Sequence, residues 1–464
     1  MKQKRQAKSA AANDKAKITA ESLEKFLEVP SEWRSLVPEE MRKISLLELP
    51  ITGINCVSSY YRDTEEKAAP PFIPTVKVLI TLERNGKWGR EPEIIAYYKM
   101  AAYVELAEKL GQKAGVNAIP KEDCVLLLMD GVVFKLVLVH DEELRLQFEA
   151  AAQFEAHPQE AAFTRNAHDA VITRQLQGVA HRFNAFSETC QLVKRWLAAS
   201  KLSGHFEDVA LELLVARCFL KPSDPTVLNG EHPESVVVAF YQFLHLLSSF
   251  DFVQQPLDVD INENFKPEDR EEIRSKFRKN RPTTRAFGYT RSGPEALVLC
   301  RVVKIAADSL AAIRKKIASK EGIKFQSLAV ADRSAYDFVL RLRPDRCTRG
   351  IEAKEAEKGG KKPAGKLAIP AVDLDVTHLT FRRLQEELGE FALFFFDHFR
   401  PEKIFVVLRK SFRSPTEAAI KQAVHKLKAD STDLLPAFVR RLEHVTEGIV
   451  KAVVPIQKPA VTPA

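Results

Sequence analysis

Aspartates separated by a single residue are the features of this sequence that could carry chemistry. Asp258 and Asp260 lie in the segment PLDVDIN, whose alternation of apolar and polar residues predicts a strand. Alternate side chains of a strand point to one face, so the two carboxylates would lie together and could hold a divalent cation. The preceding Ser248-Ser249 lacks the glycine that lets a backbone approach a phosphate. We therefore favour a strand with its polar face in water.

A second group of carboxylates follows Gly359-Gly360 and consists of Asp373, Asp375 and the more distant Asp397. Formally, this is the pattern of a magnesium-dependent nucleotidyltransferase, in which a glycine turn meets the nucleotide and the acids hold the metal. However, the glycines lie in a lysine-rich loop with no apolar residue to anchor the turn to a core. Asp373 and Asp375 also precede a helix predicted to begin near Thr377, where acidic residues satisfy exposed amides. An active nucleotidyltransferase is therefore the alternative interpretation.

Two predicted strands of the N-terminal half carry lysines where a metal site would need acids. The strands VKVLITLE and VVFKLVLV contain Lys77 and Lys135 and no aspartate pair, so they cannot assemble a two-metal clamp. The sequence holds no P-loop and no zinc-protease or serine-hydrolase motif, and we interpret His205 and His245 as core or capping residues. We predict no catalytic residue, no metal, no cofactor and no enzymatic activity.

The densest basic run is IRSKFRKNRPTTR. Lysine and arginine at this density can neutralise phosphates, and Phe277 could stack on a base. The alternative is a solvated helix face. The predicted RNA-binding residues are Arg274, Lys276, Arg278, Lys279, Arg281 and Arg285. A weaker cluster consists of Arg341, Arg343, Arg346 and Arg349.

The composition is that of an ordinary globular protein, and the net charge favours an anionic partner in a general way. Because the chain has 464 residues, several domains are expected. Its net charge is +8. Its six cysteines form no CxxC pair, which predicts reduced, buried thiols in a nuclear or cytosolic protein. No apolar stretch is long enough to cross a membrane, and we expect no membrane partner.

The elements that would position these residues begin with three helices within residues 186–252. In the first, Cys190, Val193 and Leu197 share one face, while Lys194 and Arg195 are expected to face away. Leu202-Ser203-Gly204 breaks this helix. The second is apolar on nearly every side, and the third is VVVAFYQFLHLLSSF, so both are expected to be buried.

Other elements follow from their periods and turn residues. Asp130-Gly131 between two apolar runs predicts a hairpin. The predicted strands are 51–61, 75–83, 336–342, 390–397 and 403–409, and the predicted helices are 22–27, 38–49, 91–115, 150–180, 267–281, 294–317 and 378–388.

Several segments, quoted in chain order, together carry a resemblance to a known family. They are VKVLITLERNGKWGREPEII, MDGVVFKLVLVHDEE, LVKRWLAASKLSGHFEDVALELLVA, FLHLLSSFDF, YDFVLRLRPDR and LQEELGEFALFFFDHF. In them the chain resembles the nucleolar RNA-associated protein (Nrap) family over residues 40 to 450. The resemblance implies an α+β multidomain fold: a degenerate nucleotidyltransferase-like α/β domain, a helical domain like that of poly(A) polymerase and oligoadenylate synthase, and a C-terminal α/β domain. The expected divisions are a basic leader with short helices (1–40), these three domains (41–160, 161–290 and 291–455) and a disordered tail (456–464).

The same resemblance implies a function and a location. Family members look like catalytically inactive nucleotidyltransferase repeats that act as scaffold in the small-subunit processome. For this chain it implies a location in the nucleus and nucleolus, with precursor ribosomal RNA and other processome proteins as partners in ribosomal RNA processing and small-subunit biogenesis. Family members are usually longer, with a further transferase-like module ahead of the part found here. We therefore expect either a shortened member or a native start upstream of Met1.

Overall fold

The computed structural model describes most of the chain in two compact units. The described residues are 51–65, 75–82, 92–114, 117–129, 132–140, 158–228, 232–252, 254–262, 265–279, 294–320, 322, 328, 333–347, 375–428 and 433–456. Among these residues, one unit contains 51–63 and those from 75 to 178, and the other contains 64–65, those from 179 to 347 and those from 375 to 456. The predicted helices 22–27 and 38–49 lie outside the described residues.

The first unit is built on a mixed five-stranded sheet. Its strands are β1 (Ile51–Cys56), β2 (Thr75–Leu82), β3 (Asn117–Pro120), β4 (Val125–Met129) and β5 (Val132–His140). Their order is β1-β2-β5-β4-β3, with β2 and β5 parallel and the other neighbours antiparallel. Met129 pairs with Val132, so β4 and β5 form the hairpin predicted from Asp130-Gly131. The short edge strand β3 was not predicted.

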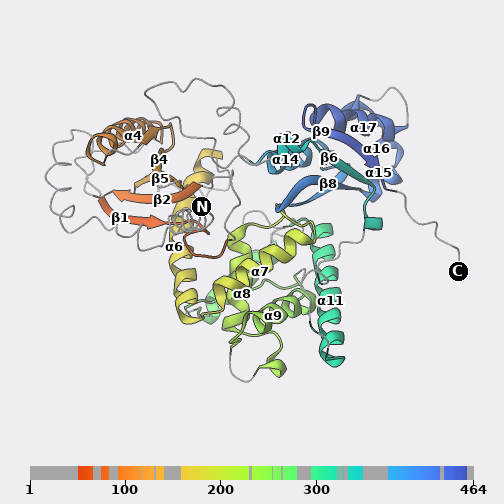
Figure 1. The fold of residues 1–464 in the computed structure, drawn as a ribbon, viewed down its shortest axis with the longest axis horizontal. Coiled ribbons are helices and arrows are strands. Elements are labelled where there is room, and N and C mark those ends of the chain that lie inside the picture. Colours follow the sequence, from red (N-terminus) through yellow and green to blue (C-terminus); the bar gives the residue numbers. More distant parts are fainter. Residues whose placement is uncertain are drawn as a thin grey trace, which may run out of the picture. The chain divides into compact units, whose positions relative to one another are not determined.

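Two predicted helices cover the faces of this sheet (Figure 1). The helices are α4 (Pro92–Ala114) and α6 (Pro158–Arg182). On one face, Tyr103 of α4 packs with Val78 and Leu136. On the other face, Ala170 of α6 lies against the smaller cluster that includes Leu79 and Val137. Both faces of the central strands are therefore buried, which explains why β2 and β5 are apolar almost throughout.

The second unit contains a helical core (Figure 1). Its helices are α7 (Phe186–Ala199), α8 (Asp208–Leu220), α9 (Val236–Ser249) and α11 (Ala296–Ala318). The first three are the predicted core helices. Trp196 is fully buried against Phe240 and Phe243 of α9, and its indole N–H donates to Ser309 Oγ of α11 at 3.2 Å.

In the described part of the chain, no helix is both long enough and apolar enough to cross a membrane.

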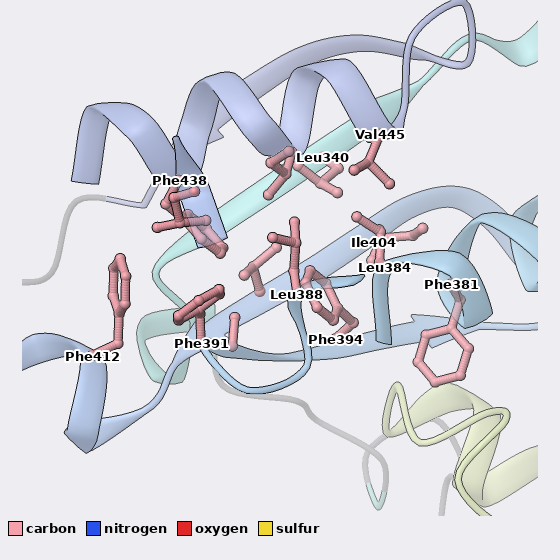
Figure 2. Packing of buried hydrophobic residues seen from close by; sticks show 14 of the residues in the cluster. Leu340, Phe381, Leu384, Leu388, Phe391, Phe394, Ile404, Phe412, Phe438 and Val445 are labelled. Atoms are coloured by element: carbon pink, nitrogen blue, oxygen red, sulfur yellow. The ribbon is translucent and has the colours of Figure 1, made fainter. Parts of the chain in front are cut away.

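A four-stranded antiparallel sheet forms the C-terminal part of this unit. Its strands are β6 (Phe338–Leu342), β7 (Ala392–Asp397), β8 (Arg400–Leu408) and β9 (Val450–Pro455), in the order β7-β8-β6-β9. The helices α14 (Val376–Leu388), α16 (Glu417–Leu427) and α17 (Leu434–Val445) supply its other layer. Figure 2 shows Phe438 of α17 and Leu384 of α14 packed with Leu340 and Ile404 of the strands. No prediction was made for α16, α17 or β9.

One predicted strand is absent. Residues 256–260 of the segment PLDVDIN have no regular structure, although their alternating pattern favoured a strand. The segment is followed by α10 (Pro267–Lys279), as predicted from the charged helical pattern. The remaining short elements are η1 (Pro225–Val227), η3 (Arg333–Ala335), α12 (Pro344–Cys347) and α15 (Lys410–Arg413).

The break after α7 forms a tight loop against β7. Lys201 and Gly204 have positive φ angles of 65° and 80°, which turn the chain sharply. Leu202 forms a bridge with Phe396, so the loop extends the edge of β7. A Cβ atom on Gly204 would lie only 2.8 Å from Phe381 Cε1, so this approach requires glycine.

Candidate functional site

Lys77 and Lys135 lie side by side on the first sheet. They are register partners on the parallel strands β2 and β5. Their neighbours Val76, Val78 and Leu136 face α4, so both lysines belong to the opposite face. The structure therefore places two cations where a metal site on these strands would need carboxylates.

Each of these lysines has its own acidic partner. Lys77 Nζ lies 3.1 Å from Asp169 Oδ2, and Lys135 Nζ lies 2.8 Å from Asp123 Oδ2. Partial burial raises the pKa of Asp123, but the hydrogen bond and the charge of Lys135 outweigh it, so the pKa is lowered overall. Both acids thus neutralise lysines.

The acids of PLDVDIN are also held by a cation. Arg270 of α10 binds Asp258 through Nη1 at 2.7 Å and Asp260 through Nη2 at 3.1 Å. Asp260 in addition accepts a hydrogen bond from the backbone N–H of Phe265. A guanidinium therefore occupies the position between the carboxylates that a metal ion would need.

The third group of acids has structural partners as well. Asp375 caps α14 and accepts from the backbone N–H of His378 at 2.9 Å, which agrees with the predicted cap. Asp397 is bound by Lys201 Nζ at 2.9 Å. Asp373 and Gly359-Gly360 lie outside the described residues. Within the described ranges, no group of histidines, cysteines and acids is arranged to hold a metal.

The predicted basic run begins in α10. Arg274 and Arg278 are exposed, and their Nη1 atoms lie 3.6 and 3.7 Å from the carboxylate of Glu271. These long, solvated contacts leave both guanidinium groups accessible to another anion. Phe277 is half-buried. The side chains of Lys276, Lys279, Arg281 and Arg285 lie outside the described part of the structure.

The buried thiols agree with a reduced protein, with one exception. Cys56, Cys124, Cys190 and Cys218 are free and buried, whereas Cys300 is exposed. Burial raises the pKa of the Cys56, Cys124 and Cys218 thiols to about 12, so they are protonated and unreactive. The prediction of buried thiols is wrong at Cys300, because its place on α11 turns it to the exposed face.

A buried charge cluster around Lys194 does not follow from the sequence patterns. This side chain was expected to face away from the core, but only 8% of it is exposed, and its Nζ lies 2.6 Å from Glu65 and 3.3 Å from the fully buried Glu212. Glu212 also accepts a hydrogen bond from Thr64 Oγ1 at 2.6 Å. Burial alone lowers the pKa of Lys194, but the surrounding carboxylates raise it above its ordinary value. One signal was available, since Lys194 lies four residues after buried Cys190.

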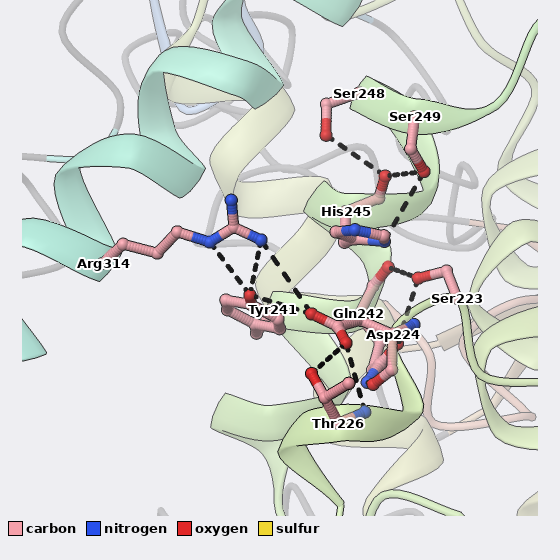
Figure 3. A network of polar contacts seen from close by, with 9 residues as sticks. All are labelled: Ser223, Asp224, Thr226, Tyr241, Gln242, His245, Ser248, Ser249 and Arg314. Carbon is pink, nitrogen blue, oxygen red and sulfur yellow. Dashed lines mark hydrogen bonds and ion pairs between the residues drawn. The ribbon is translucent and has the colours of Figure 1, made fainter.

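A second polar network was also missed, and Figure 3 shows it. Gln242 of α9 is fully buried, and its Oε1 accepts hydrogen bonds from Ser223 Oγ at 3.0 Å and from the backbone N–H of Asp224 at 2.8 Å. Tyr241 donates to Asp224 and accepts from Arg314 of α11. The network fastens the loop before η1 to α9 and α11, so its groups serve packing.

Three known protein-family domains match consecutive parts of the chain. The Nrap protein nucleotidyltransferase domain 4 matches residues 6–191, the Nrap protein PAP/OAS1-like domain 5 matches 183–331, and Nrap protein domain 6 matches 333–454. The three matches follow one another along the chain. The chain belongs to the Nrap family. The resemblance read from the sequence is thereby confirmed, as is the α+β fold with a nucleotidyltransferase-like and a PAP/OAS1-like domain.

Relatives of this Nrap chain come from vertebrates and insects. Nucleolar protein 6 of Xenopus laevis is 28% identical over 421 residues, which cover 84% of this chain and 36% of the relative. The Homo sapiens protein of the same name is 27% identical, covering 79% of this chain and 34% of the relative. The chain thus spans about a third of the length of these relatives. Because relatives in diverse species are named as nucleolar proteins, the predicted nucleolar location is confirmed.

Solved structures show a weaker likeness to the Nrap chain. A crystal structure of mtPAP with CTP is 11% identical, with a TM-score of 0.33 over 64% of this chain and 67% of that one. The polymerase core of TRAMP, an RNA surveillance complex, is 14% identical, with a TM-score of 0.32 over 64% of this chain and 84% of that one. The fold class rests on the family match.

Proposed function

We propose that this Nrap chain is a non-catalytic, RNA-associated scaffold of the small-subunit processome. It acts in precursor ribosomal RNA processing and small ribosomal subunit biogenesis, and it contacts precursor ribosomal RNA and other processome proteins. Membership of the Nrap family and the nucleolar relatives support the setting. The net charge of +8 favours an anionic partner.

The observation that carries the non-catalytic part of the proposal is the pair Lys77 and Lys135. Phosphoryl transfer with two metals needs carboxylates that converge on the ions. On this face of the sheet, cations stand on adjacent strands instead, and Asp169 and Asp123 neutralise them. A metal placed between two ammonium groups would be repelled, so this arrangement favours scaffolding.

RNA contact is proposed for the basic run that starts in α10. Arg274 and Arg278 have side-chain exposures of 58% and 71%, and they face solvent on a helix that also carries Lys276 and Lys279. Arg281 and Arg285 continue the run in sequence. Such a run would bind phosphates without regard to base sequence.

Crosslinking in cells tests this proposal. We expect ultraviolet crosslinking of the tagged protein to recover precursor small-subunit ribosomal RNA. Replacing Arg274, Lys276, Arg278 and Lys279 by glutamine should weaken the recovery. The matched control replaces four lysines elsewhere, Lys304, Lys315, Lys421 and Lys428, by glutamine and should leave recovery unchanged. Absence of ribosomal precursor from the wild-type sample would refute direct RNA association.

The alternative is an active magnesium-dependent nucleotidyltransferase that uses Asp373, Asp375 and Asp397. Against it, Asp375 caps a helix and Asp397 binds Lys201. The test is magnesium-dependent incorporation of labelled nucleotide into RNA by the purified chain. We expect none. Incorporation that is lost in Asp373→Asn but kept in the exposed control Asp308→Asn would overturn the scaffold proposal.

A further inference from the structure

The C-terminal sheet has a second face, opposite the one that its helices cover, and the exposed part of this face carries cations. Leu340 and Leu342 of β6 and Ile404 of β8 point into the core beneath the helices. Because side chains alternate along a strand, Arg341 and Lys403 point to the opposite face. Both are exposed, and they are register partners on the antiparallel strands β6 and β8. The sheet therefore holds an arginine and a lysine directly opposite each other.

This pair has no acidic partner among the described residues. The side chains of Arg341 and Lys403 form no ion pair or hydrogen bond within the described ranges. The neighbour of Arg341 on β9 is Ala452, which brings no charge. The exposed Glu402 is next to Lys403 in sequence, so strand alternation directs it to the other side.

More positive charge lies close by. Arg343 is exposed and directly follows the C-terminal end of β6, two residues beyond Arg341. Like charges placed opposite each other in a sheet repel and destabilise it. An anion bound between them would relieve the repulsion, which makes charge complementarity the argument for a ligand here.

We propose that the exposed part of this face, centred on Arg341 and Lys403, binds the phosphate backbone of RNA. The inference rests on the RNA association proposed above but assigns a surface separate from α10. The aromatic side chains Phe405 and Phe395 that also belong to this face are buried, and Arg301 stacks over Phe395. The half-buried Val339 and Ala452 near the pair offer no ring to stack on bases. The face therefore contacts phosphates and is indifferent to base sequence.

The test measures binding of a fluorescent single-stranded RNA of mixed sequence to the full chain at several salt concentrations. Replacing Arg341 and Lys403 by glutamine removes two phosphate contacts. We expect weaker binding and a salt slope shallower by about 1.4, since each contact with a single strand contributes about 0.7. Arg341→Lys keeps the charge and should bind nearly as the wild type does. The control Lys410→Gln with Lys421→Gln should leave the slope unchanged.

The possible outcomes separate the two proposals. An unchanged slope in Arg341→Gln with Lys403→Gln, combined with weaker binding in Arg274→Gln with Arg278→Gln, would overturn this surface and leave RNA association standing. No binding by the wild type would overturn both. If the double variant lost binding to poly-glutamate but kept its binding to RNA, this surface would bind an acidic protein, and the proposal would be overturned. If the double variant failed to fold, Lys403→Gln alone would carry the test, with half the change in slope.

Discussion

The two sheets of this protein each carry two cations opposite each other on neighbouring strands, but their surroundings differ. In the N-terminal sheet, Lys77 and Lys135 are bound by Asp169 and Asp123. In the C-terminal sheet, Arg341 and Lys403 have no acidic partner among the described residues. A basic pair on a sheet is therefore not by itself a binding site. The acids brought near it decide whether its charge is used within the fold or remains available to a ligand.

Lys194 is a buried cation that carboxylates neutralise within the fold. Removing one of these carboxylates should have the largest effect on stability. Glu212→Ala leaves the buried ammonium with less compensation, and removing one partner of a buried ion pair costs about 3 kcal/mol or more. We expect hydrogen exchange of the α7 and α8 amides, followed by mass spectrometry, to accelerate strongly. The control Glu234→Ala removes an exposed acid and should change little. Unchanged exchange in Glu212→Ala would mean that the cluster does not stabilise these helices.

His205 is a buried histidine whose protonation should make the stability of the fold depend on pH. Burial lowers its pKa to about 4, although its Nε2 hydrogen bond to the Phe394 carbonyl favours the charged form. The folded pKa lies below the ordinary value near 6.5, so the neutral ring stabilises the fold above that pH. This contribution is lost as the pH falls from about 6.5 toward 4. We expect the unfolding temperature of the wild type to fall more over this range than that of His205→Gln. Equal falls would show that the neutral His205 ring does not stabilise the fold.

Removing Lys77 and Lys135 should have a modest effect and leave RNA binding untouched. The lysine side chains are 29% and 34% exposed, so each ion pair contributes at most about 1 kcal/mol. Lys77→Ala with Lys135→Ala should lower the unfolding temperature slightly and keep the salt slope of RNA binding, unlike Arg341→Gln with Lys403→Gln. A shallower slope in the first variant would break the comparison, because it would show that neutralised lysines also bind RNA.

The smallest expected effect has the opposite sign. Arg341→Gln removes the repulsion from Lys403 and should stabilise the C-terminal sheet by about 0.3 kcal/mol in the absence of RNA. Lys135→Gln, which loses an ion pair, should not stabilise the protein. Thermal unfolding of both variants measures the difference. Equal destabilisation would indicate that Arg341 has an internal role.

Local patterns predicted elements better than they predicted the partners of charges. The three core helices and the hairpin between β4 and β5 follow from periodicity and from Asp130-Gly131, which act over a few residues. PLDVDIN was wrong as a strand, because alternation is also compatible with an irregular segment whose acids turn toward Arg270. Lys194 was wrong as an outward residue, because its partner Glu65 lies far away in the sequence.

The sequence by itself determined the helix and strand periods, the lack of an aspartate pair on β2 and β5, and the family resemblance, because these depend on residue order alone. Only the tertiary structure decided which charges are neutralised. Coulomb energy depends on distance in space, and residues as far apart as Lys77 and Asp169, or Lys201 and Asp397, meet only after folding. For the same reason, the Arg341 and Lys403 pair became visible only when the strand register was known.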